Sequence, residues 1–204
     1  MAAYGETPSM VLPLMVLGFV TLLYLSAATS LARRATRGWS AWRTGSWALG
    51  AMLLALGLLP QYLPFSHHDL RQHMMQHLLL GMLAPLALVM SAPITLFLRT
   101  APRPVARAIV RLLRSGAVRI LANPATALTV NLGGMAAIYF TPLYAATMAR
   151  PSLHYLVHFH FVAAGCLYVW VIAGPDPAPR RLSVPGRLVV LGFAVVAHLS
   201  LIHI

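Results

Sequence analysis

The chain has 204 residues, of which 59% are hydrophobic and only 9% are charged, whereas about half and about a quarter are usual in a soluble globular domain. Its formal net charge is +12, because arginines greatly outnumber the three acidic residues and lysine is absent. This composition excludes an ordinary soluble core and indicates a membrane protein. The single cysteine, Cys166, excludes an intrachain disulfide and any metal site built on a cysteine pair.

Six apolar runs bounded by Arg, Pro or Gly are long enough to cross about 30 Å of hydrocarbon. Because no water is present there to satisfy the backbone, each run is expected to be a helix. The expected spans are 10–31, 46–63, 73–98, 124–146, 153–173 and 185–204. We therefore predict an all-α fold in which six transmembrane helices form one integral-membrane domain over 1–204.

The positions of the arginines predict how the chain crosses the membrane, since positive residues accumulate in short cytoplasmic loops. All of them except Arg71 and Arg150 lie in the loops after the first, third and fifth runs. We therefore expect these loops to be cytoplasmic and the N-terminus to be outside. Membrane topology then accounts for the positive charge, and no nucleic acid partner is predicted.

The third loop contains a segment, 105–121, in which arginines surround a set of apolar residues. A helix would place Ile109, Leu112, Leu113 and Ile120 near one face. Two interpretations are open: an interfacial helix that lies on the anionic lipid of the bilayer, or a solvated loop that only sets the topology.

Histidines dominate the polar residues expected inside the membrane, where ionisable groups are costly and mark functional sites. His73 and His77 on the third run and His154 and His158 on the fifth are spaced i,i+4, so each pair lies on one helical face. With a rise of about 1.5 Å per residue, His198 reaches a similar depth from the opposite end of the sixth run. We therefore predict a metal-binding histidine cluster of these five residues near the external face.

The donor set favours copper, because imidazole and thioether ligands suit copper better than calcium or magnesium. Weaker candidate ligands on the same side of the membrane are His67, His68, Met74 and Met75. We expect Cu(I), which is satisfied by two or three such ligands. No Ser/His/Asp arrangement, phosphate loop or paired carboxylate is present, so we predict that the chain is not an enzyme.

Two other functions remain open from the residues alone. Histidines on two helices can be the axial ligands of a b-type haem, although duplicated i,i+4 pairs are then unexplained. Alternatively, the chain is a scaffold for other membrane proteins, and its histidines only form hydrogen bonds between helices.

Several motifs in chain order resemble a family of bacterial membrane proteins. They lie between about Gln61 and His198 and cover roughly two thirds of the chain. The motifs are His73-Met-Met-Gln-His77, Ala84-Pro85, Asn123-Pro124, Tyr139-Phe-Thr-Pro142, His154-x-x-x-His158 and Gly174-Pro-Asp176-Pro177. Together they resemble the CtaG-type cytochrome c oxidase assembly proteins, which are multi-pass inner-membrane proteins.

This resemblance implies a role in cytochrome c oxidase assembly, in which the chain helps to deliver copper to the catalytic subunit. It places the five predicted histidine ligands on family histidine positions, and Asp176 on the family's cytoplasmic Asp-Pro turn. The family usually has a seventh helix, whereas this sequence stops at Ile204 within an apolar run. We therefore expect the chain to be truncated at its C-terminus.

Overall fold

Helix is the regular secondary structure throughout the described part of the chain, which comprises residues 7–34, 38–59, 75–179 and 181–202 of a computed structural model. The all-α class predicted from composition is thus confirmed. The chain divides into two compact units, Met1–Ala101 and Pro102–Ile204, and each is described by itself. The prediction of one integral-membrane domain stays a prediction.

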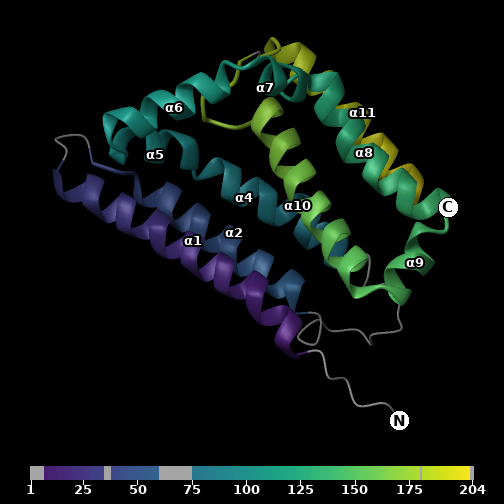
Figure 1. Ribbon diagram of the computed structural model, residues 1–204. Coiled ribbons are helices and arrows are strands. Elements are labelled where there is room, and N and C mark those ends of the chain that lie inside the picture. Colours follow the sequence, from purple (N-terminus) through teal and green to yellow (C-terminus); the bar gives the residue numbers. More distant parts are fainter. Residues whose placement is uncertain (1–6, 35–37, 60–74, 180, 203–204) are drawn as a thin grey trace. The chain divides into compact units, whose positions relative to one another are not determined.

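The first unit is built on two long helices, α1 (Thr7–Arg34) and α2 (Ala41–Leu58). A third helical stretch is described from Met75. It continues through the π-helical segment η2 (Leu79–Leu83), α4 (Ala84–Met90) and α5 (Pro93–Thr100). Helix α2 packs along α1 and along α4, and α5 packs against α1 (Figure 1). The unit is therefore a bundle with α2 between its neighbours.

Prolines interrupt the helix that we expected to run unbroken over 73–98. Pro85 has no N–H for the carbonyl four residues earlier, and η2 lies there, where the N–H of Ala84 reaches the carbonyl of Leu79. Pro93 disfavours a helical conformation at the preceding residue, and Ala92 has a left-handed backbone with φ of 56°. The expected single helix thus consists of consecutive helical segments, with an interruption at Ala92.

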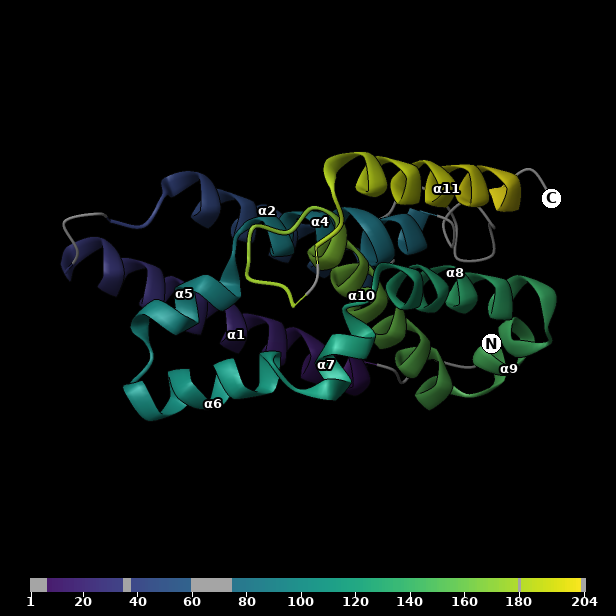
Figure 2. The same ribbon diagram turned by 90° about the horizontal axis from the view of Figure 1, so that it is seen from above.

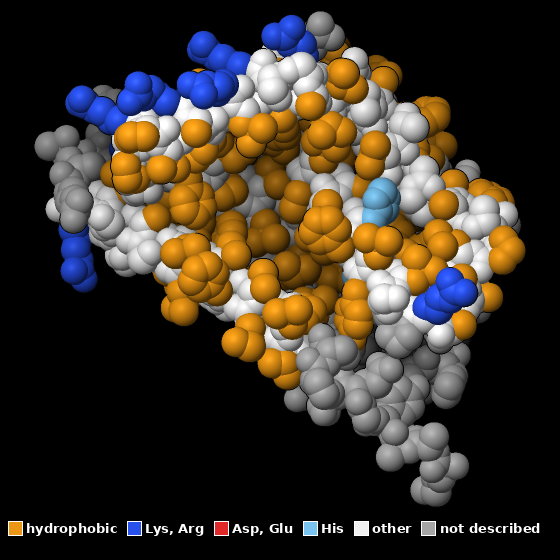
Figure 3. All heavy atoms as spheres, viewed as in Figure 1, with side chains coloured by type: hydrophobic (Ala, Val, Ile, Leu, Met, Phe, Trp, Pro, Cys, Tyr) orange, Lys and Arg blue, Asp and Glu red, His pale blue; other side chains and the backbone are white. Residues whose placement is uncertain are grey.

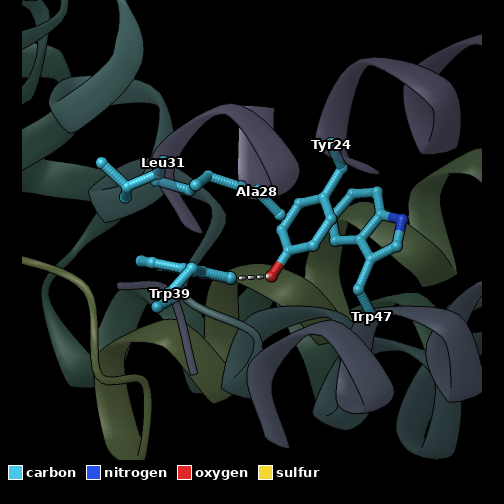
Figure 4. Packing of buried hydrophobic residues seen from close by; sticks show 7 residues of the cluster. Tyr24, Ala28, Leu31, Trp39 and Trp47 are labelled. Atoms are coloured by element: carbon cyan, nitrogen blue, oxygen red, sulfur yellow. Dashed lines mark hydrogen bonds between the residues drawn. The ribbon is translucent and has the colours of Figure 1, made fainter. Parts of the chain in front are cut away.

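Tyr24 lies at the centre of the first unit and is fully buried (Figure 4). Its ring stacks on Trp47, with centroids 4.2 Å apart. Its hydroxyl accepts a hydrogen bond from Nε1 of Trp39 at 3.2 Å and donates one to the carbonyl of Ser91 at 3.0 Å. One side chain therefore connects α1, the start of α2 and the interruption between α4 and α5.

Replacing Tyr24 with phenylalanine is expected to destabilise the chain by about 1–3 kcal/mol, because buried hydrogen-bonding groups lose their partner. The check is the midpoint of SDS-induced unfolding in detergent micelles. Tyr168→Phe is the comparison, since that hydroxyl donates one longer bond, 3.3 Å, to the carbonyl of Val190. Equal effects of the two variants would contradict the central role of Tyr24.

The second unit contains six helices in its described residues. They are α6 (Arg103–Leu113), α7 (Gly116–Leu121), α8 (Pro124–Phe140), α9 (Leu143–Ala149), α10 (Pro151–Ile172) and α11 (Val184–Ile202). Helix α8 packs against both α10 and α11, and the short α9 joins α8 to α10 (Figures 1 and 2). The core of this unit lies between these three long helices.

Two expected helices of this unit are each divided in two. The helix that one of the two interpretations placed over 105–121 is broken at Ser115, whose hydroxyl accepts a hydrogen bond from the N–H of Val118 at 3.3 Å and caps α7. The expected run over 124–146 is broken at Thr141, which is extended because Pro142 follows it. The predicted start of that run is confirmed, since Asn123 caps α8 by accepting a bond from the N–H of Ala125 at 3.0 Å.

Three described helices are long and apolar enough to cross a membrane. They are Val11–Arg33, Met75–Thr100 and Ser152–Ile172. A shorter apolar helix spans Val184–Ala197. The expectation of six spans is therefore supported for three of them and stays a prediction for the others.

Candidate functional site

The predicted histidine pair on α10 is in contact. The rings of His154 and His158 have centroids 4.2 Å apart and planes inclined at 62°. His158 is buried, with 6% of its surface exposed, and His154 is half-buried. The i,i+4 spacing therefore places both imidazoles on one face in the first turns of α10, as predicted.

Helices α8 and α9 are the neighbours of α10 in this part of the unit. Both pack against α10, and α9 ends only two residues before α10 begins. Thr147 on α9 is buried, with 5% of its surface exposed. The pair thus lies at the end of the second unit that the α8–α9–α10 connection closes.

Apart from Arg150, which directly precedes α10, the arginines of the second unit gather at the opposite end of this helix. Ala122 and Ala127 pack in the same core cluster as Val171 and Ile172, so the start of α8 lies beside the end of α10. The arginine-bearing segment before α8 and the loop after α10 therefore share one end of the unit. The 22 residues of α10 separate that end from the other by about 33 Å.

The first unit also has arginines gathered at one end. Leu31, Trp39 and Leu96 share one core cluster, which brings Arg33, Arg43 and Arg99 to the same end. The side chain of Gln76 donates to the carbonyl of Gly57 at 2.8 Å, near the other end of α2. His77, the next residue, is half-buried there. In each unit, the described arginines thus lie at the end opposite to the candidate histidines, except for Arg150, which directly precedes α10.

The contact between His154 and His158 is that of two aromatic rings rather than two ligands around one ion. A metal about 2.0 Å from a ring nitrogen lies about 3.2 Å from the ring centroid, so two rings on a tetrahedral ion have centroids about 5 Å apart. The observed 4.2 Å is shorter. Rotation of the side chains must therefore open the pair by about 1 Å for both nitrogens to face one ion.

The remaining predicted ligands are placed only in part. His67, His68, His73 and Met74 lie outside the described residues, as does the side chain of His198 on α11. Met75 precedes His77 by two residues, about 200° around a helix, so these two do not share a face. Within the described ranges, no group of three or more His, Cys, Asp or Glu side chains is arranged to hold an ion. Copper binding by the predicted cluster stays a prediction.

His160 has a role that the spacing of the histidines did not reveal. It lies against α8 and points to a different side of α10 from the pair. A Cβ atom on Gly134 would come within 2.3 Å of its Nε2. This Nε2 is buried and has no hydrogen-bond partner among the described residues. The Gly133–Gly134 sequence was the available signal, because small residues let helices approach closely.

Gly134→Ala is expected to destabilise the chain by about 1–3 kcal/mol, because the added methyl group overpacks the α8–α10 contact. Gly133→Ala is the matched control, since no atom lies within 4 Å of its Cβ position. The temperature at which each detergent-purified variant loses monodispersity checks the expectation. A Gly134→Ala variant as stable as Gly133→Ala would show that His160 moves aside at no cost.

The turn after α10 is also built from specific contacts. Asp176 is buried, with 1% of its surface exposed. The guanidinium of Arg181 donates to the carbonyl of Gly174 at 2.8 Å and to the carbonyl of Asp176. The carboxylate of Asp176 lies beyond the C-terminal end of α10, whereas the histidine pair lies near its N-terminal end. Asp176 therefore does not belong to that site.

Comparison with known proteins identifies the chain at the level of its family. The family model described as cytochrome c oxidase caa3 assembly factor matches residues 22–202. This match includes α10 with its histidine pair and the turn that contains Asp176. No solved structure matches the chain.

Curated relatives are found in mycobacteria. The uncharacterized protein Mb0105 of Mycobacterium bovis and the uncharacterized protein MT0111 of Mycobacterium tuberculosis are each 32% identical over 186 residues, or 88% of this chain. The uncharacterized protein ML1998 of Mycobacterium leprae is 30% identical over 171 residues, or 80% of this chain. The matched region makes up 28% of the length of Mb0105 and of MT0111 and 26% of the length of ML1998. The chain therefore spans about a quarter of the length of these relatives.

Proposed function

Since this chain belongs to the cytochrome c oxidase caa3 assembly factor family, we propose that it is a non-enzymatic assembly factor that carries copper to the oxidase. In this proposal, histidines near the external face of the membrane bind copper transiently. The copper is cargo, which leaves with the oxidase subunit that receives it.

The observation that supports this proposal most directly is the contact between His154 and His158. The two imidazoles share one face of a membrane-spanning helix, where a polar side chain is costly and calls for a functional reason. The chain has only three acidic residues, so hard oxygen ligands are scarce. Neutral nitrogen donors without carboxylates favour copper, most simply Cu(I).

A third ligand completes the proposed site. His73, His77 and His198 are the proposed contributors from other helices. Two or three ligands suffice for Cu(I), and weak coordination favours release to a partner.

The distribution of arginines and histidines between the two ends of each unit supports an external position for the site. The arginine-bearing ends are proposed to be cytoplasmic, in line with the positive-inside rule. The histidine ends are then external, and the N-terminus is outside. The proposed location is the bacterial cytoplasmic membrane, and the proposed partner is the catalytic subunit of the oxidase.

The test is the copper content of the full chain purified in detergent, compared with a variant in which His73, His77, His154 and His158 are all replaced by alanine. We expect about one copper per chain in the parent and a loss of copper in the variant. Circular dichroism and gel filtration of both samples establish that each is folded.

An absorption spectrum of the same samples separates the alternatives. Copper in the parent without a Soret band would support the carrier. A folded parent with no more copper than the variant would overturn it, and a Soret band lost in the variant would assign the histidines to haem.

A further inference from the structure

Helices α6 and α7 present an arginine face and an exposed apolar face that the proposed copper site does not use. None of their residues is buried. Leu112 has 62% of its surface exposed, Val105 has 49% and Ile120 has 66%. Apolar side chains that protrude to this degree from a charged segment indicate a surface that another apolar phase covers.

The two faces of α6 are cleanly separated. With about 100° per residue, Arg103, Arg107 and Arg111 fall within an arc of about 80°. Val105 and Leu112 fall on the far side of the helix. Figure 3 shows arginine side chains along the surface over α6. Such a division of charge and apolar surface is typical of helices that lie in the plane of a membrane interface.

The charge of the segment identifies the lipid. Arg114 and Arg119 add to the three arginines of α6, and no acidic residue occurs between Asp69 and Asp176. Nothing within the segment therefore neutralises these cations. Anionic headgroups attract basic segments at a membrane surface, and acyl chains cover apolar side chains beside them.

We propose that residues 103–121 form a binding surface for anionic phospholipid, in which the arginines contact headgroup phosphates while Val105, Leu112 and Ile120 enter the acyl boundary. This surface lies at the end of the second unit opposite to His154 and His158. In this proposal the bilayer positions the segment, and the copper site plays no part in lipid binding.

The test uses the full chain in lipid nanodiscs, with Cys166→Ser and a single environment-sensitive fluorophore on a new cysteine. Leu112→Cys reports the apolar face, and Arg107→Cys is the matched control on the arginine face. In nanodiscs that contain phosphatidylglycerol, quenching by aqueous iodide at position 112 is expected to be about threefold weaker than at position 107. Fluorescence at position 112 should also be quenched by lipids labelled on their acyl chains.

Four further results decide the proposal. Replacement of the segment's five arginines by glutamine, or of phosphatidylglycerol by phosphatidylcholine, is expected to abolish the difference between the two positions. Equal iodide quenching at both positions in every lipid would establish a solvated loop and overturn the proposal. Protection of position 112 from iodide only in native membranes would overturn the proposal in favour of a protein partner. Protection that is the same with either headgroup, and with or without the arginines, would exclude recognition of anionic lipid.

Discussion

In cells, the double substitution His154→Ala with His158→Ala is expected to lower the amount of mature cytochrome c oxidase to that of a strain without the protein. The two imidazoles are in contact on one face of α10, so the substitution removes two of the proposed ligands at once. Loss of a residue that only supports a metal ligand reduces affinity by about 10–100-fold, and loss of two ligands should exceed this. The measurement is the oxidase content of membranes grown with limiting copper.

His160→Ala is the matched control on the same helix. His160 lies against Gly134 rather than against the pair, so this variant changes helix packing and leaves both proposed ligands in place. We expect less chain in the membrane but an unchanged amount of oxidase for each assembly factor molecule. Excess copper in the medium should partly restore the double variant.

Two outcomes would contradict this expectation. Normal oxidase maturation in a double variant that accumulates to parent levels would remove His154 and His158 from the mechanism. A loss of oxidase that follows only the amount of chain in the membrane, equally for both variants, would reduce the pair to a packing role.

Local rules in the sequence predicted much of this structure. The i,i+4 spacing predicted the contact of His154 with His158, and the Asn123–Pro124 sequence predicted the start of α8. The breaks at Ala92 and Thr141 follow equally local rules, because each residue precedes a proline. Hydropathy does not indicate these breaks, because the apolar character of the chain continues through both of them.

Long-range contacts could not be predicted in the same way. Tyr24 bonds to Ser91, 67 positions later in the chain, and no periodicity relates those two residues. The contact of His160 with Gly134 likewise depends on how α8 and α10 pack. Whether His77 and His198 join the pair depends on the same kind of information, because spacing places residues on a face but does not choose the helix opposite.

A close contact between a glycine and the backbone of a neighbouring helix in the first unit predicts the largest loss of stability. A Cβ atom on Gly50 of α2 would lie 2.7 Å from Cγ of Leu88 and 2.8 Å from its backbone N. One turn earlier, the hydroxyl of Ser46 donates to the carbonyl of Ala87 at 2.7 Å. Two turns later, a Cβ atom on Gly57 would meet the side chain of Leu80 in η2 at 2.6 Å. A line of small residues thus lets α2 approach the backbone of α4.

Gly50→Leu is therefore expected to force α2 away from α4 and to break the Ser46 bond with it. Overpacking alone costs about 1–3 kcal/mol, and an unpaired buried group adds about 1–3 kcal/mol, so little folded chain should remain at growth temperature. The measurement is the folded fraction during SDS titration, together with the yield of monodisperse protein.

Gly45→Leu is the control, because it lies on the same helix and no atom is within 4 Å of its Cβ position. Both variants gain helix propensity, worth about 1 kcal/mol relative to glycine, so the difference between them isolates the contact with Leu88. Gly50→Ala should fall between them, since its smaller side chain still meets the backbone N of Leu88. If Gly50→Leu unfolds at the same SDS fraction as Gly45→Leu, α2 and α4 do not depend on this close approach.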